Sequence, residues 1–214
     1  MVQILPKPLT VREFIDRYGD SDRYELIDGE LIEMEPTGPH EEVAAFLGRK
    51  LNVAIEQQDE LFLIPYRCLI DILGTATAFR PDLIVLDQRQ LTYEPLWRQE
   101  PVITLGTSIK LVVEIVSTNC QNDYARKAED YALFGVPEFW IVDYLGLGGR
   151  DYIGTPKQPT FTLCTLQGNR YQRQLFRNDV RITSPLFPTL KLTANPVFAA
   201  GNSEDWRSAG TSTG

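Results

Sequence analysis

The chain has 214 residues, of which 43% are hydrophobic and 23% are charged, and this composition excludes an intrinsically disordered protein. Its formal net charge of −8 argues against tight nonspecific binding to nucleic acid, although a local basic patch would still permit binding at one site. The length allows one substantial core. We therefore expect a single domain over residues 1–198 and a flexible tail at 199–214.

The cysteines and the apolar runs indicate the cellular location of the protein. Cys68, Cys120 and Cys164 are far apart and odd in number, so they form neither a zinc-ligand spacing nor a disulfide framework. The sequence has no apolar run of membrane-spanning length and no signal segment. We expect a cytoplasmic protein that does not associate with membranes.

The first predicted elements are a short helix and a hairpin. Thr10 and Glu13 have the capping-box spacing, which predicts a helix over residues 11–18. Asp28-Gly29 lies between two β-prone runs and predicts a hairpin within residues 23–34. The chain therefore begins with local structure that its own sequence specifies.

Two candidate site residues follow the turn of this hairpin. Alternation places Glu30 on the same side as Ile32 and Met34, so Glu30 either leans toward the apolar side or remains a solvated acid at the turn. His40, the only histidine, begins a helix predicted over residues 40–57. A lone histidine there is more often a structural hydrogen-bonding group than a catalyst, and no nucleophile–histidine triad is supported.

The next predicted elements are two strands and a connection. Residues 61–70 alternate weakly and predict one strand. Pro81 precedes an apolar run in which Asp82, Ile84 and Leu86 share a face. Residues 88–107 are polar and predict a long surface excursion.

The apolar run at residues 110–117 is predicted to be the central strand, buried on both faces, and it carries Glu114 in its middle. Burying an ionised carboxylate costs several kcal/mol unless a cation, a metal ion or a proton compensates it. Because Asp82 opens a neighbouring apolar run, the two acids suggest a shared divalent-metal site. Spacing alone leaves open the alternative of two salt-bridged core acids.

A helix is predicted over residues 123–134, directly after the Glu114 strand. Asp123, Lys127 and Tyr131 follow one another at four-residue steps on one face of it. Lys127 can reach back over Glu114, or it can remain a solvated lysine that pairs with an acid of its own helix.

The remaining predictions complete the sheet. Residues 138–143 predict a strand parallel to the Glu114 strand, because a helix separates the two. Residues 160–166 and 170–176 predict a hairpin, and residues 184–192 predict a proline-marked edge segment.

Several short motifs occur together in one order. They are Tyr24-Glu-Leu-Ile-Asp-Gly-Glu30, His40, Arg80-Pro-Asp82, Val112-Val-Glu-Ile-Val-Ser117, Asp123 with Lys127 and Tyr131, and Gly135-Val-Pro-Glu-Phe-Trp-Ile-Val-Asp143. Over roughly residues 10–195 the chain resembles the PD-(D/E)xK nuclease superfamily, and within it the Uma-two family of prokaryotic proteins. The resemblance implies an α/β, restriction-endonuclease-like fold: a central mixed sheet flanked by helices, with an N-terminal β-hairpin extension. It also implies metal-dependent cleavage of DNA.

The resemblance assigns roles by position. Asp82 and Glu114 become the catalytic acids, and together with the carbonyl of Ile115 they would hold Mg²⁺, with Mn²⁺ as a substitute. Val116 stands where the superfamily has its lysine, and Lys127 on the next helix is the implied replacement. The resemblance leaves supporting roles to four residues: Glu30, His40, Asp123 and Tyr131.

Two further expectations concern partners. A basic rim over the acids, from Arg67, Arg80, Arg126 and Lys127, would favour DNA cleavage. The alternative is a catalytically inactive interaction or regulatory module in which Lys127 and Arg80 hold the acids as a buried ionic cluster, and the acidic net charge favours it. The resemblance and three aromatic residues, Tyr93, Trp97 and Trp206, lead us to expect a homodimer.

Overall fold

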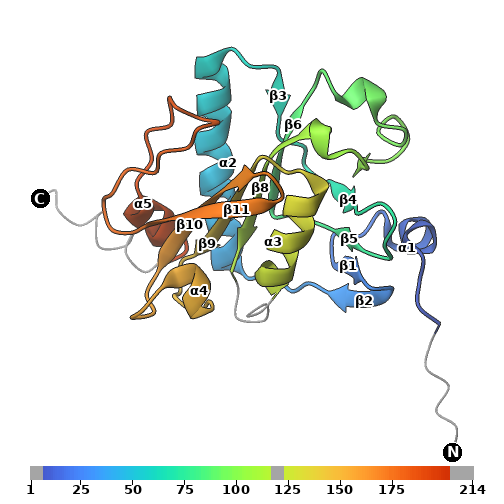
Figure 1. The fold of residues 1–214 in the computed structure, drawn as a ribbon, viewed down its shortest axis with the longest axis horizontal. Helices are drawn as coiled ribbons and strands as arrows, with labels where there is room; N and C mark the ends of the chain where they lie inside the picture. Colours follow the sequence, from blue (N-terminus) through green and yellow to red (C-terminus); the bar gives the residue numbers. More distant parts are fainter. Residues whose placement is uncertain (1–6, 117–122, 203–214) are drawn as a thin grey trace, which may run out of the picture.

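A computed structural model describes residues 7–116 and 123–202, with side chains from residue 125 onward in the second range (Figure 1). Its helices are α1 (Val11–Tyr18), α2 (Gly38–Gln58), α3 (Asp123–Phe134), α4 (Arg150–Ile153) and α5 (Ala194–Ala200), with 3₁₀ turns η1 (Leu91–Tyr93) and η2 (Gly106–Ser108). None of the helices in the described part of the chain could span a bilayer.

The strands form two mixed sheets. The larger sheet contains, in spatial order, β11 (Arg170–Phe176), β10 (Thr160–Gln167), β9 (Glu138–Asp143), β8 (Ile109–Ile115), β6 (Leu83–Asp87) and β3 (Phe62–Leu63). The smaller sheet contains β2 (Glu30–Glu33), β1 (Tyr24–Ile27), β5 (Ala78–Phe79), β4 (Leu69–Asp71) and β7 (Val102–Ile103). The predicted α/β class, the N-terminal hairpin and the parallel pairing of β8 with β9 are confirmed.

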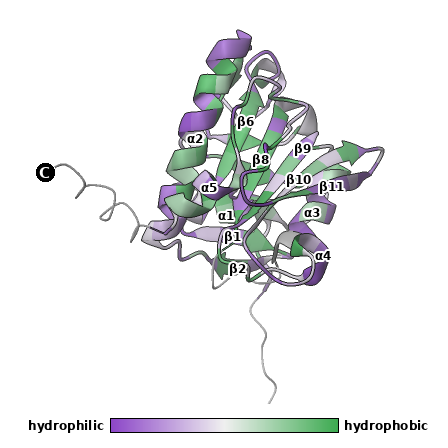
Figure 2. Cartoon of the chain, turned by 90° about the vertical axis from the view of Figure 1, so that its left-hand side faces the viewer, coloured by the Kyte–Doolittle hydropathy of each residue, from purple (hydrophilic) through white to green (hydrophobic). Residues whose placement is uncertain are grey.

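Helices cover both faces of the larger sheet. Successive side chains of a strand point to opposite faces, so neighbouring residues of β8 join different cores. Val113 of β8 belongs to a core that includes α2, whereas Val112 belongs to a core that includes α3 (Figure 1). Glu114 is two residues after Val112, so its side chain points to the same face, the one covered by α3. Figure 2 shows the hydrophobic strands between helices whose surfaces carry hydrophilic residues.

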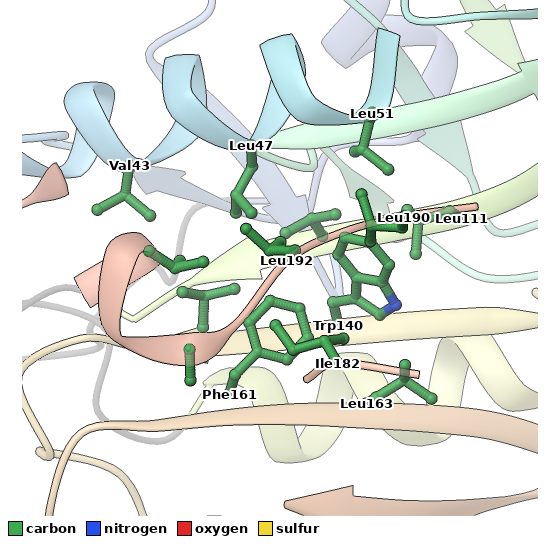
Figure 3. Packing of buried hydrophobic residues seen from close by; sticks show 14 of the residues in the cluster. Val43, Leu47, Leu51, Leu111, Trp140, Phe161, Leu163, Ile182, Leu190 and Leu192 are labelled. Atoms are coloured by element: carbon green, nitrogen blue, oxygen red, sulfur yellow. The ribbon is translucent and has the colours of Figure 1, made fainter. Parts of the chain in front are cut away.

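The α2 side of the core is a continuous apolar layer. Figure 3 shows side chains of α2 facing those of the strands, with the C-terminal segment filling the space beside them, and the labelled residues are Val43, Leu47, Leu51, Leu111, Trp140, Phe161, Leu163, Ile182, Leu190 and Leu192. Leu47 is fully buried there.

We predict that Leu47→Ala lowers the free energy of unfolding by about 2–5 kcal/mol, because it removes buried methyl groups and leaves a cavity. Urea unfolding measures this change. Leu133→Ala on the exposed side of α3 is the control and should change stability by less than about 0.5 kcal/mol. Equal effects of the two substitutions would contradict the assignment of this core.

One predicted element was wrong and another was incomplete, because their pairing depends on distant residues. Residues 61–70 do not form one strand: β3 joins the larger sheet, and the chain then crosses to β4 in the smaller one. Residues 88–107 lie largely at the surface as predicted, but β7 within them pairs with β4, and the buried Glu94 accepts hydrogen bonds from the backbone of Thr104 and Leu105.

The C-terminal part also differs from the prediction. Residues 184–192 form no strand; the Ser184 hydroxyl instead donates to the buried carboxylate of Glu138, 2.6 Å away. Helix α5 was not predicted and runs to Ala200, and residues from 203 onward lie outside the described ranges. The domain boundary and the cytoplasmic location stay predictions.

The aromatic residues that suggested a homodimer do not share one environment. Tyr93 is exposed, but Trp97 packs against the core on the α3 side, and Trp206 lies outside the described residues. The homodimer stays a prediction, with less support from these side chains.

Candidate functional site

Asp82, the residue just before β6, lies beside Glu114 of β8. β6 and β8 are antiparallel, with Leu83 opposite Val113, and one further step of this register places Asp82 opposite Glu114. Oδ2 of Asp82 also accepts a hydrogen bond from the backbone N–H of Ile115, with an N–O distance of 2.6 Å. The structure therefore brings together the two acids that the sequence singled out.

Glu114 is almost completely buried and has two side-chain partners, both from α3. The Tyr131 hydroxyl donates to its Oε1 at 2.7 Å, and the Lys127 ammonium donates to its Oε2 at 3.2 Å. Burial raises the pKa of Glu114 to about 8, with the charges of Asp82 and Glu25 acting in the same direction and Lys127 and Tyr131 opposing it. An anion at this position needs positive charge beside it.

Lys127 is buried as well, and it contacts a second acid that the sequence analysis missed. Its Nζ lies 2.9 Å from Oε1 of Glu25 on β1, a residue that is 1% exposed. The same Glu25 oxygen accepts a hydrogen bond from the backbone N–H of Arg80, at 2.7 Å. A signal was present, because Glu25 stands inside a β-prone apolar run just as Glu114 does.

His40, at the start of α2, contacts the other acid. Its Nε2 is 3.2 Å from Oδ2 of Asp82, and its ring is buried. Burial by itself lowers the pKa of His40, but the hydrogen bonds and charges of Asp82 and Glu41 together outweigh it, so the net pKa is raised.

Two of the supporting residues are not brought into this group. Of the two alternatives left open for Glu30, the structure agrees with the solvated acid at the turn, because every residue of β2 is exposed, and Glu30 does not line the cleft described below. Asp123 begins α3, but its side chain lies outside the described residues.

The basic rim that would favour DNA cleavage is only partly present, because Arg67, Arg80 and Lys127 line the cleft described below but Arg126 does not. Arg80 is buried, and its guanidinium donates to the backbone carbonyls of Tyr18, Gly19 and Tyr24. Arg126 forms an ion pair with Asp28 in the hairpin turn. Structural partners therefore take up these two cations, and Arg80 holds an acid only through its backbone N–H.

The acids open into a cleft of about 1020 Å³. β3 pairs only with Leu86 and Asp87 of β6, and the cleft lies along the preceding residues of that edge, from Asp82 to Ile84. Its other walls come from α2, the β1–β2 hairpin and the segment between β3 and β4. Eight Asp and Glu residues line it against five Arg and Lys residues, so the cleft is net acidic.

The acid pair fits a magnesium ion. Mg²⁺ prefers oxygen ligands and is commonly bound by one or two carboxylates with water in the remaining positions. In the described residues no three acidic, histidine or cysteine side chains gather as a metal cluster, so Asp82 and Glu114 are the side-chain donors to consider. The hydrogen bonds of Asp82 engage Oδ2, and Oδ1 has no donor among the described residues.

The raised pKa of Glu114 predicts how stability depends on pH without metal. A group whose pKa is higher in the folded state stabilises the fold below its unfolded pKa of about 4.5, and this contribution is lost as the pH rises toward 8. In EDTA we expect unfolding free energy to fall between these pH values by a few kcal/mol, at about 1.4 kcal/mol per pKa unit. Urea unfolding across this range measures it, and Glu114→Gln should flatten the profile; an unchanged slope in that variant would contradict the assignment.

Comparisons with known proteins agree with the fold. The model of a family named Uma2 and described as "Putative restriction endonuclease" matches residues 11–195. A crystal structure described as a putative nuclease belonging to DUF820, from Anabaena variabilis ATCC 29413, superimposes with a TM-score of 0.66 at 19% sequence identity, covering 91% of this chain and 99% of that chain. The comparison with curated proteins gave no match.

Proposed function

Because the chain belongs to the Uma2 family, we propose that it is a metal-dependent endonuclease that hydrolyses phosphodiester bonds of DNA. The observation that carries this proposal is the pairing of Asp82 with Glu114 at a cleft, with the Lys127 ammonium 3.2 Å from Glu114. Carboxylates can bind a divalent ion that activates water, and a nearby ammonium group can offset the charge that develops on the phosphate.

Asp82, Glu114 and the backbone carbonyl of Ile115 would hold Mg²⁺, and Mn²⁺ would substitute for it. When bound, the ion neutralises charge on the phosphate and makes a water molecule more acidic. Its positive charge also compensates the buried carboxylate of Glu114, which the low-polarity surroundings otherwise keep protonated.

The protein groups around the acids position the reacting parts. Lys127 is held by Glu25 and Glu114, so its ammonium has a fixed place from which it would orient the attacking water and offset charge on the phosphate. Tyr131 and His40 hold one oxygen of Glu114 and of Asp82, respectively. Such contacts to ligating side chains set their orientation.

One observation favours a second candidate function. Glu25, Lys127 and Glu114 already form a buried ionic cluster without a metal ion, and the cleft above it is net acidic. A catalytically inactive interaction or regulatory module would show this arrangement too. The two candidates differ in whether the acids bind a divalent ion.

Metal titration followed by thermal unfolding separates them. We expect Mg²⁺ and Mn²⁺ to raise the melting temperature saturably, with about 2.7 kcal/mol of stabilisation at a hundred times the dissociation constant. Asp82→Asn should remove most of this effect. Asp87→Asn is the control, because Asp87 is a buried acid at the far end of β6, the strand that follows Asp82. No stabilisation of the wild type by either ion would favour the inactive module.

A further inference from the structure

The segment between β3 and β4 presents an aromatic side chain at the cleft. Tyr66 is fully exposed, the most exposed large hydrophobic side chain among the described residues, and it lines the same cleft as the two acids. Two hydrogen bonds anchor the segment beside it. The guanidinium of Arg67 donates to the carbonyl of Asp20 at 2.7 Å, and the backbone N–H of Leu69 donates to the carbonyl of Pro101. The segment that carries Tyr66 is therefore fixed beside the cleft by hydrogen bonds to other parts of the fold.

Other apolar side chains also line the cleft. Ile32 of the hairpin and Val53 of α2 are both partly exposed and line the cleft, as do Ile64 and Pro65 beside Tyr66. By contrast, Glu114 in the same cleft is almost fully buried. The cleft thus has exposed apolar side chains in its lining as well as the buried acid.

The charges of the cleft are poorly suited to duplex DNA. Two of its five cations pair with carboxylates: Arg23 with Glu33, and Lys127 with Glu25 and Glu114. The guanidinium of Arg80 donates to three backbone carbonyls, and one nitrogen of the Arg67 guanidinium donates to the carbonyl of Asp20. Among the described residues, Arg49, Arg67 and Arg80 have no carboxylate within ion-pair distance. Duplex binding gains most of its affinity from neutralising many phosphates, which this net acidic cleft cannot do.

Unpaired bases offer a different source of affinity. A base can stack on an aromatic side chain regardless of its sequence, and loss of one such platform weakens binding about 5- to 150-fold. In duplex DNA the bases stack on one another, and their faces are not accessible to Tyr66. An exposed tyrosine beside one guanidinium suits a base and its neighbouring phosphate in a single strand.

We propose that the cleft binds single-stranded DNA, with a base stacked on Tyr66 and the adjacent phosphate at Arg67, so that the chain of nucleotides leads to Asp82 and Glu114. This inference rests on the proposed nuclease function and names its substrate class.

Fluorescence anisotropy with labelled oligonucleotides tests it. Binding of a single strand and of the duplex of equal length is measured with Ca²⁺ in place of Mg²⁺, for the wild type, Tyr66→Ala, Tyr66→Trp and Tyr93→Ala. We expect the wild type to bind the single strand at least about tenfold more tightly than the duplex. Tyr66→Ala should weaken single-strand binding about 5- to 150-fold, and Tyr66→Trp should retain it. Tyr93→Ala, an exposed tyrosine outside the cleft, should bind like the wild type.

Cleavage assays with Mg²⁺ keep this inference separate from the proposed function. Single-strand preference that depends on Tyr66, without cleavage of any DNA, would overturn the nuclease and leave the binding site. Cleavage of duplex as fast as single strands, unchanged in Tyr66→Ala, would overturn the single-strand inference and leave the nuclease. Failure to bind single-stranded DNA would overturn it as well.

Discussion

Replacing Glu114 by glutamine should lower DNA cleavage at least about a thousandfold while the protein remains folded. The amide keeps the size of the side chain and an oxygen for the Tyr131 hydroxyl, but it has no negative charge to bind a divalent ion. Lys127 keeps Glu25 as its partner. Glutamine is preferable to alanine because alanine would leave a cavity between Lys127 and Tyr131.

Cleavage of a labelled single-stranded oligonucleotide and of supercoiled plasmid, each with Mg²⁺ or Mn²⁺, measures the loss, and circular dichroism shows whether the fold persists. Glu138→Gln is the matched control, because Glu138 is also a buried carboxylate on the larger sheet, bound by Trp140 and Ser184 and absent from the cleft lining. That variant should cleave like the wild type. Metal-dependent cleavage that survives in Glu114→Gln would remove the proposed function.

Elements with a local signal were predictable from the sequence. The capping box of Thr10 and Glu13, the Asp28-Gly29 turn and the helix from residue 123 to 134 all appear as expected. The approach of Lys127 to Glu114 was one of two alternatives that the sequence left open, the other being a solvated lysine, and the structure has the first. Residues close in the chain determine these features.

The rest of the site depends on contacts between distant residues. Glu25 reaches Lys127 across 102 positions of the chain, and nothing near Glu25 indicates that partner. Glu30 was the more visible acid because it follows the turn, but the hairpin leaves it at the surface and turns Glu25 inward. The position of the smaller sheet decides this, and its short strands β5 and β7 carry little sequence pattern of their own.

Replacing Lys127 by methionine should destabilise the metal-free protein by about 3–5 kcal/mol, because Glu25 and Glu114 would remain buried without their cation. Cleavage should also be lost. Urea unfolding in EDTA measures the stability, and Lys110→Met is the control. Lys110 pairs with Asp87 at 3.2 Å but is partly exposed, so its loss should cost about 1 kcal/mol or less.

The response of Lys127→Met to metal then discriminates between the candidate functions. If Asp82 and Glu114 form an ion site, Mg²⁺ replaces the missing positive charge and should stabilise the variant more than the wild type. The double variant Lys127→Met, Glu25→Gln should be more stable than Lys127→Met alone, because it has one buried charge fewer. If Lys127→Met is as unstable with Mg²⁺ as without it, the acids require the lysine and do not bind an ion. The cluster of Glu25, Lys127 and Glu114 would then have a structural role only.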